Sequence, residues 1–139
     1  MKRLTSPPPD FPDFAGDTDP AFSPNGQYLT FARFSGYSDI YQLSLAGGEE
    51  TLVFDKAVYG RYWTVTQRGI YFVPSTWHQN PSIEFFNFVT SQLSQVVALE
   101  RTPVGRFYPG LSVSPNGQSI LCALLEQDGS DIMLVENFR

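Results

Sequence analysis

The fold is decided by the stretch GLSVSPNGQSILCALLEQDGSDIMLVENFR, residues 110–139. A turn tetrad, Ser114-Pro115-Asn116-Gly117, precedes an apolar run, and a short polar loop then leads to Ser130-Asp131-Ile132 and a second apolar run. The same order occurs near the start of the chain, in FSPNGQYLTFARFSGYSDIYQLSL, residues 22–45. Because turn, apolar run and polar loop recur together, we interpret the two stretches as copies of one unit.

The chemistry of the tetrad predicts a hairpin turn in both copies. Proline at the second turn position presets φ, and the asparagine and glycine that follow tolerate the left-handed conformation. The residue before proline is biased towards extended backbone, so Ser23 and Ser114 suit the end of a strand. Each tetrad is therefore expected to join two antiparallel strands.

A third, weaker copy lies between these two, in TVTQRGIYFVPSTWHQNPSIEFFNF, residues 64–88. Here Gln67-Arg68-Gly69 stands in place of Pro-Asn-Gly, and Pro81-Ser82-Ile83 in place of Ser-Asp-Ile. The copies then follow one another at about 45 residues, a spacing that is typical of the four-stranded blades of a β-propeller.

These residues resemble the TolB-type (WD40-like) β-propeller repeat, in which SPNG, an apolar strand and SDIY or SDIM follow in this order. Residues 58–139 are similar to the closing blades of bacterial TolB-like propellers, through GIYFV, IEFFNF and the ending QDGSDIMLVENFR. The family usually has Asp where Asn25 and Asn116 stand, and the middle copy lacks the Ser-Pro pair. The resemblance implies a non-catalytic propeller that binds protein. Family members are often periplasmic or membrane-tethered, and some carry an N-terminal winged-helix regulator domain, which nothing in this chain matches.

We therefore predict an all-β fold of about three four-stranded antiparallel blades, a partial or half propeller whose last blade lacks its outer strand. The predicted division is an outer-strand remnant with a Pro-rich linker at 1–17, blade 1 at 18–57, blade 2 at 58–103 and an incomplete blade 3 at 104–139. No helix is predicted, because the β-branched pairs Val89-Thr90 and Val96-Val97 favour strands over a helix across residues 87–99. The expected strands are 20–22, 28–34, 39–45, 51–54, 62–66, 70–73, 83–89, 95–99, 111–114, 119–125 and 132–136.

Three blades are too few for a ring, since closed propellers use about four to eight. One interpretation is that the chain is a piece of a larger propeller and pairs with the remaining blades. The other is a homodimer that completes a six-blade ring, with Lys2–Thr5 of one chain completing the last blade of its partner. Both predict association, because an open stack exposes a sheet edge and an apolar face.

Composition excludes several other classes of protein. The 139 residues are 42% hydrophobic and 17% charged, with a net charge of −5 and a pI of about 4.6. Nine basic residues are spread along the chain, so no nucleic-acid partner is expected. No apolar stretch is long enough for a membrane span. No export signal is expected, because polar and proline residues follow the basic start where a leader needs an apolar core.

Catalytic and metal-binding motifs are not recognisable. His78 is the one histidine, and Gly110–Ser114 approaches a Gly-x-Ser-x-Gly elbow but ends in serine. We interpret Asp17-Thr18-Asp19 and Asp128–Asp131 as turn formers rather than cation ligands, since neither fits a calcium loop. Cys122 lies in an apolar run and is expected to be buried. No enzyme activity and no cofactor are predicted.

The best candidate binding surface comes from propeller topology. Loops that enter the inner strands and loops that join the second and third strands share one face. GRYW at 60–63 and GRFY at 105–108 recur there, with Tyr37 and residues 77–79. Arginine, tyrosine and tryptophan are enriched at binding hot spots. The alternative is that the aromatics pack between blades and the arginines are solvated. The candidate residues at this channel mouth are Tyr37, Arg61, Tyr62, Trp63, Trp77, His78, Arg106 and Tyr108.

The predicted function is that of a protein-interaction scaffold. One alternative is the sensory, ligand-binding part of a bacterial transcriptional regulator. Another is the accessory propeller of a prolyl-oligopeptidase-type peptidase, whose catalytic domain has no counterpart in these residues.

Overall fold

The structure is a computed structural model that describes residues 1–76, 78, 80–126 and 129–138. Across this part of the chain it contains β-strands and no helix, so the predicted all-β fold is confirmed. The strands are β1 (Gly16–Phe22), β2 (Tyr28–Phe34), β3 (Ser38–Ser44), β4 (Thr51–Leu52), β5 (Val58–Val65), β6 (Gly69–Pro74), β7 (Ser82–Asn87), β8 (Leu93–Ala98), β9 (Leu111–Val113), β10 (Ser119–Glu126) and β11 (Gly129–Glu136).

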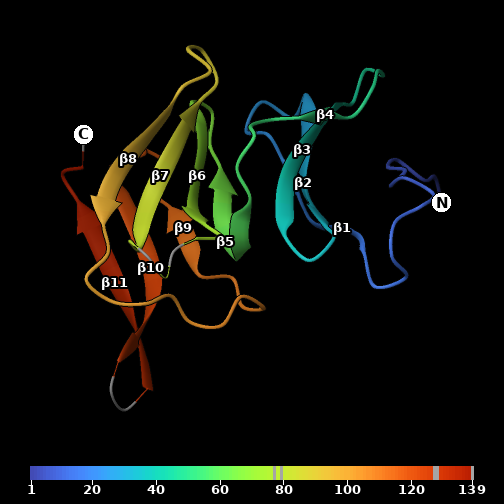
Figure 1. The fold of residues 1–139 in the computed structure, drawn as a ribbon. Helices are drawn as coiled ribbons and strands as arrows, with labels where there is room; N and C mark the ends of the chain where they lie inside the picture. The colour runs from blue at the N-terminus through green and yellow to red at the C-terminus, as the bar shows by residue number, and fades with distance from the viewer. Residues whose placement is uncertain (77, 79, 127–128, 139) are drawn as a thin grey trace.

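All strand pairs are antiparallel, and neighbours in the chain are mostly neighbours in the sheets. The order β1-β2-β3, with β4 on β3, leads into β5-β6-β7-β8, and β9-β10-β11 form a second sheet. A single pair, Ser38 with Val58, links β3 to β5 and makes the first eight strands one sheet. Figure 1 shows these groups side by side, with the two termini at opposite ends. The division into blades stays a prediction, because pairing crosses one of the expected boundaries.

The two tetrads form the same turn, as their chemistry predicts. Ser23 Oγ donates to Asn25 Oδ1 at 2.6 Å, and Ser114 Oγ donates to Asn116 Oδ1 at the same distance. Gly26 and Gly117 have φ of 68° and 70°, in the left-handed region that favours glycine. The middle copy closes with a shorter turn, in which Thr66 Oγ1 donates to the Gly69 carbonyl oxygen.

Two of the three core clusters meet at β6 and form two layers there. Ile70 and Phe72 pack on one face of this strand, in a cluster with residues of β2, β3, β5 and β7. Tyr71 and Val73 pack on the other face, in a cluster that includes Ile120, Cys122 and Leu124 of β10. The side chains of a strand alternate between faces, so β6 contributes to both layers and is buried along its whole length. These layers hold the three groups of strands together.

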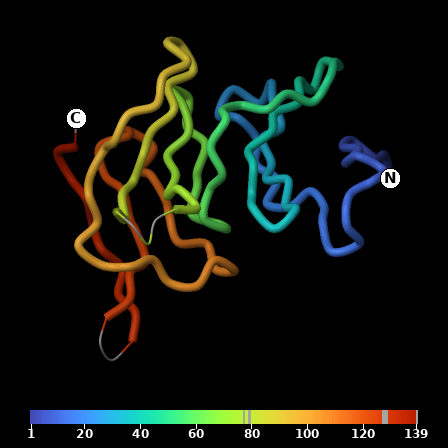
Figure 2. Tube along the Cα trace, viewed as in Figure 1, coloured from blue at the N-terminus to red at the C-terminus, as the bar shows by residue number. Residues whose placement is uncertain are grey.

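Two strands begin four residues earlier than predicted, the largest differences in strand start. β1 starts at Gly16 instead of residue 20, and β5 starts at Val58 instead of residue 62. Residues 2–5, expected as an outer strand, form no strand in this single chain. The N-terminal segment is tied down by side chains instead: the Ser6 amide donates to Glu50 Oε1 at 2.7 Å. Figure 2 shows this segment at one end of the molecule and the β10–β11 hairpin at the other.

Candidate binding surfaces

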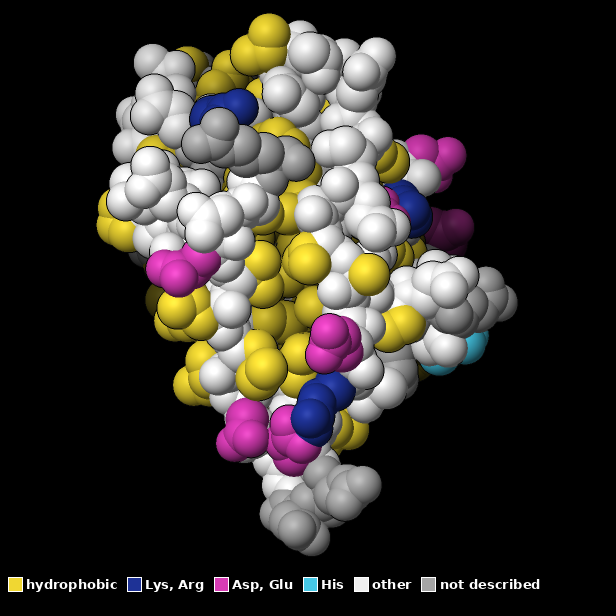
Figure 3. Space-filling view, turned by 90° about the vertical axis from the view of Figure 1, so that its left-hand side faces the viewer, with side chains coloured by type: hydrophobic (Ala, Val, Ile, Leu, Met, Phe, Trp, Pro, Cys, Tyr) yellow, Lys and Arg dark blue, Asp and Glu magenta, His cyan; other side chains and the backbone are white. Residues whose placement is uncertain are grey.

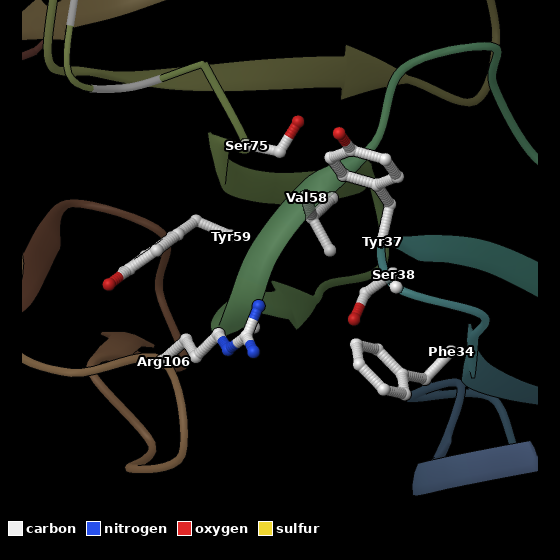
Figure 4. A pocket seen from close by; sticks show the side chains of 9 residues that line it. Phe34, Tyr37, Ser38, Val58, Tyr59, Ser75 and Arg106 are labelled. Carbon is white, nitrogen blue, oxygen red and sulfur yellow. The ribbon is translucent and has the colours of Figure 1, made fainter. Parts of the chain in front are cut away.

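Two adjoining pockets lie where the β2–β3 turn, the start of β5 and the connection between β8 and β9 meet. One has a volume of about 110 Å³ and the other of about 220 Å³. Both are lined by Phe34, Ser38, Gly60 and Arg106. The smaller pocket is shown in Figure 4, where Arg106 extends towards Phe34 and Ser38 on the opposite wall. We call the two together the Arg106 pocket.

The structure brings the GRYW and GRFY segments into direct contact. The Arg61 amide donates to the Arg106 carbonyl oxygen at 3.1 Å. Gly60 makes this approach possible, because a Cβ at this position would lie 2.1 Å from the same oxygen. The two segments are not equivalent, however: GRYW lies within β5, whereas GRFY lies in the connection before β9. Tyr37, from the β2–β3 turn, lines the same pocket and is mostly exposed.

Two of the candidate residues are in the core, so that part of the prediction needs correction. Tyr62 has no exposed surface, and its hydroxyl donates to the Ala123 carbonyl oxygen at 2.8 Å. Burial raises the pKa of Tyr62 to about 12. Trp63 points to the opposite face of β5 and packs with the other core layer. Alternation along a strand sends neighbouring side chains to opposite faces, and here both faces are covered.

The remaining candidates differ in position. Tyr108 and His78 are exposed, and within the described residues neither lines the Arg106 pocket. Trp77 lies outside the described residues, as does its neighbour Gln79. The lining residues that were not among the candidates include Phe34, Ser38, Ser75 and Phe107. Phe107 is the third residue of GRFY, so the recurring motif itself indicated it.

The two arginines of this surface have different electrostatic surroundings. A β-bulge between Thr18 and Ala21 interrupts the pairing of β1 with β2. Within it, Asp19 adopts a φ of 51° and its Oδ1 lies 2.7 Å from Arg61 Nε. Arg106 makes no ion pair with any described residue. Its guanidinium carbon instead lies 5.8 Å from the centre of the Phe34 ring and 5.2 Å from that of Phe107.

A buried charge network that sequence analysis did not predict lies on the outer face of the first strands. Arg33 on β2 binds Asp17 with two hydrogen bonds, at 2.7 and 3.0 Å, and Glu50 with one at 2.6 Å. The guanidinium also lies 4.6 Å from the centre of the Tyr41 ring. The arginine in the otherwise apolar FARF of β2 was the only indication in the sequence.

Asp17 links this network to pH. Burial by itself would raise the pKa of Asp17, but hydrogen bonds from Arg33 and Thr5 and the arginine charges outweigh it, so the pKa lies below the ordinary 3.8. The pKa of Asp17 is lower in the folded state than in the unfolded state. The ionised carboxylate therefore stabilises the fold fully at a pH above the unfolded-state pKa, and this stabilisation is lost as the pH falls through the folded-state pKa.

We therefore expect the free energy of unfolding to fall as the pH is lowered below about 4. Asp17→Asn should be less stable at neutral pH and should show a shallower loss in acid. Urea unfolding at a series of pH values measures both. An unchanged acid dependence in Asp17→Asn would show that other carboxylates cause it.

Several side chains considered for catalytic or metal chemistry have other surroundings in the described part of the chain. Asp17 and Asp19 of β1, weighed above as cation ligands, are paired with Arg33 of β2 and Arg61 of β5. Asp128 lies outside the described residues, and within them no three His, Cys, Asp or Glu side chains gather in a metal-binding arrangement. Cys122 is buried, and burial raises the pKa of its thiol to about 12. No helix in the described ranges has the length and hydrophobicity to cross a membrane.

A second surface is the outer face of β9–β11, which we call the end face. On β10, Ile120, Cys122 and Leu124 point inwards to the core, so Leu121 and Leu125 point outwards. Leu134 pairs with Leu121, and Ile132 with Ala123, on the same outer face. Ile132 and Leu134 are 73% and 56% exposed. Figure 3 shows hydrophobic side chains gathered over this end of the molecule, with charged side chains near the hairpin tip.

Two solved structures have the same fold over most of this chain. They are TolB from Acinetobacter baumannii, at 18% sequence identity and a TM-score of 0.61, and a TolB candidate from Agrobacterium tumefaciens, at 19% and 0.60. Each match covers 84% of this chain but only 29% and 44% of the other chains. The chain thus has a TolB-like β-propeller fold and spans less than half the length of either protein. No protein-family model and no curated protein matches it.

Proposed function

We propose that this TolB-like propeller segment is a non-catalytic scaffold for protein interaction, and that the end face is where it associates. The observation that carries the proposal is the row of exposed apolar side chains on β10 and β11. Contiguous apolar patches on a folded protein mark surfaces that another protein covers. Exposed isoleucine and leucine would each contribute about 1.5–3 kcal/mol if fully buried.

The pairing of the strands supports the same conclusion. β3 carries β4 at its outer side, and β7 carries β8. Within the described residues β11 pairs with β10 alone, so its other edge offers unpaired backbone groups. An unpaired edge next to an apolar face favours the addition of further strands. The occupant we favour is a further set of propeller strands, supplied by a second copy of this chain in the six-blade homodimer described above.

The first test is the native mass of the purified chain, measured by light scattering over a range of concentrations. A discrete two-chain species is expected. Ile132→Asp combined with Leu134→Asp should convert it to a folded monomer, because charges on a buried apolar face are strongly unfavourable. The matched control is Leu52→Asp with Val89→Asp, which adds the same charge at exposed apolar positions away from the end face.

A cooperative monomer at every concentration would contradict self-association. Dissociation in the control variant as well would mean that net charge, rather than the end face, controls assembly. In either case the proposed occupant of the end face would be wrong.

A further inference from the structure

We propose that the Arg106 pocket binds a carboxylate, supplied by an acidic side chain in an extended segment of a partner protein. The inference builds on the proposed role in protein interaction, but it concerns a different surface from the end face. The chain would then have a site that recognises a partner protein, in addition to the end face through which two copies associate.

The charge of the pocket indicates an anion. Arg106 is the only charged residue among the nine that line the smaller pocket, and no carboxylate is among them. The larger pocket contains one acidic residue, Asp19, which is already paired with Arg61. The pocket therefore retains one uncompensated positive charge in a protein whose net charge is −5. A bound carboxylate would neutralise it.

The surroundings of Arg106 suit a carboxylate in particular. The guanidinium is a planar fork of donors that matches the two oxygens of a carboxylate. The rings of Phe34 and Phe107 lie beside the exposed guanidinium without neutralising its charge, and they add cation–π contacts that hold it in place. Figure 4 shows the Ser38 hydroxyl on the wall that faces Arg106, where it can donate to a remaining lone pair of the carboxylate.

The size of the pocket favours a side chain over a whole small molecule. Sites for drug-sized ligands usually measure about 300–1,000 Å³, and neither part alone, at about 110 and 220 Å³, reaches that size. Tyr37 and Phe107 stand at its rim and are largely exposed. These rings offer contact area to the residues on either side of the acidic one. An acidic residue between two apolar neighbours is therefore the expected ligand.

The test uses short peptides and the full chain. Phe-Glu-Phe-amide with an uncharged fluorophore on its amino end and the matching Phe-Gln-Phe-amide are titrated by anisotropy, with acetate as a competitor. The glutamate peptide should bind at least about tenfold more tightly than the glutamine peptide, since only the first forms a charge-assisted pair. Arg106→Gln should remove this preference. Arg68→Gln, which removes the same charge from the exposed β5–β6 turn, should retain it.

Each other outcome overturns the proposal. Equal affinities for the two peptides, or absence of binding, would show that the pocket does not select a carboxylate. Loss of the preference in Arg68→Gln would assign it to overall charge. Competition by acetate as strong as that by unlabelled glutamate peptide would assign the site to free small carboxylates instead of a protein partner. Light scattering tests the end face separately from these peptide titrations. A negative result with the peptides would therefore not contradict the proposal that two chains associate through the end face.

Discussion

Replacing Arg33 with alanine is expected to destabilise the protein by about 3–5 kcal/mol, because it leaves two largely buried carboxylates without their positively charged partner. The side chains of Arg33, Asp17 and Glu50 are only 7%, 10% and 17% exposed. Removing one member of a buried ion pair is strongly destabilising, because the remaining charge stays buried and uncompensated. Replacing the whole group by apolar side chains would change the free energy of unfolding far less. Glu50 also accepts from the Ser6 amide, so the loss should release the N-terminal segment.

Urea unfolding at neutral pH measures this effect. Arg33→Lys should recover only part of the stability, since an ammonium cannot reproduce the two-point contact with Asp17. Arg68→Ala is the control, because an exposed turn arginine should change stability by no more than about 0.5 kcal/mol. If Arg33→Ala cost less than about 1 kcal/mol, the network would have to be well hydrated, contrary to its burial.

Replacing Tyr62 with alanine is expected to cost about 3–5 kcal/mol, the range found for large aromatic residues in cores. The ring lies between β5 and the β9–β10 sheet, against the backbone of Gly110. A Cβ on Gly110 would lie 2.0 Å from Tyr62 Cζ, which shows how closely the ring is enclosed. The cavity left by alanine would therefore separate two parts of the same core layer.

Tyr62→Phe distinguishes packing from hydrogen bonding. It keeps the ring and removes the hydroxyl that donates to Ala123, so it should cost only about 1–2 kcal/mol. The midpoints of chemical unfolding of the three proteins give the comparison. A Tyr62→Ala protein as stable as wild type but deficient in partner binding would restore the surface position that the sequence analysis predicted for this residue.

Most of the strands could be predicted because their causes are local. The tetrads at Ser23 and Ser114 carry their own turn chemistry, and the apolar runs that follow begin where the structure places β2 and β10. The early starts of β1 and β5 were missed, since residues 16–19 and 58–61 have no apolar alternation. They are strands because their backbone pairs with β2 and β6.

The Arg106 pocket could be predicted only in part. The recurring GRYW and GRFY motifs predicted that Arg61 and Arg106 line one channel mouth, and in the structure both line the larger part of the Arg106 pocket. Propeller topology predicted equivalent positions in successive blades, whereas the structure shows direct contact through the Arg61 amide. Phe34 and Ser75 were missed because they come from other strand ends, which only folding brings beside Arg106.

The sequence by itself determined that this chain is a series of antiparallel hairpins with the TolB-like repeat, because turn residues act within a few positions of themselves. Only the tertiary structure decided which aromatic side chains are buried. Alternation separates the two faces of a strand but does not tell which face another sheet will cover, and in β5 both are covered. That depends on contacts between distant residues, such as Tyr62 with Ala123 and Arg33 with Asp17. The same long-range packing leaves the end face open and Arg106 without an acidic partner in the described structure.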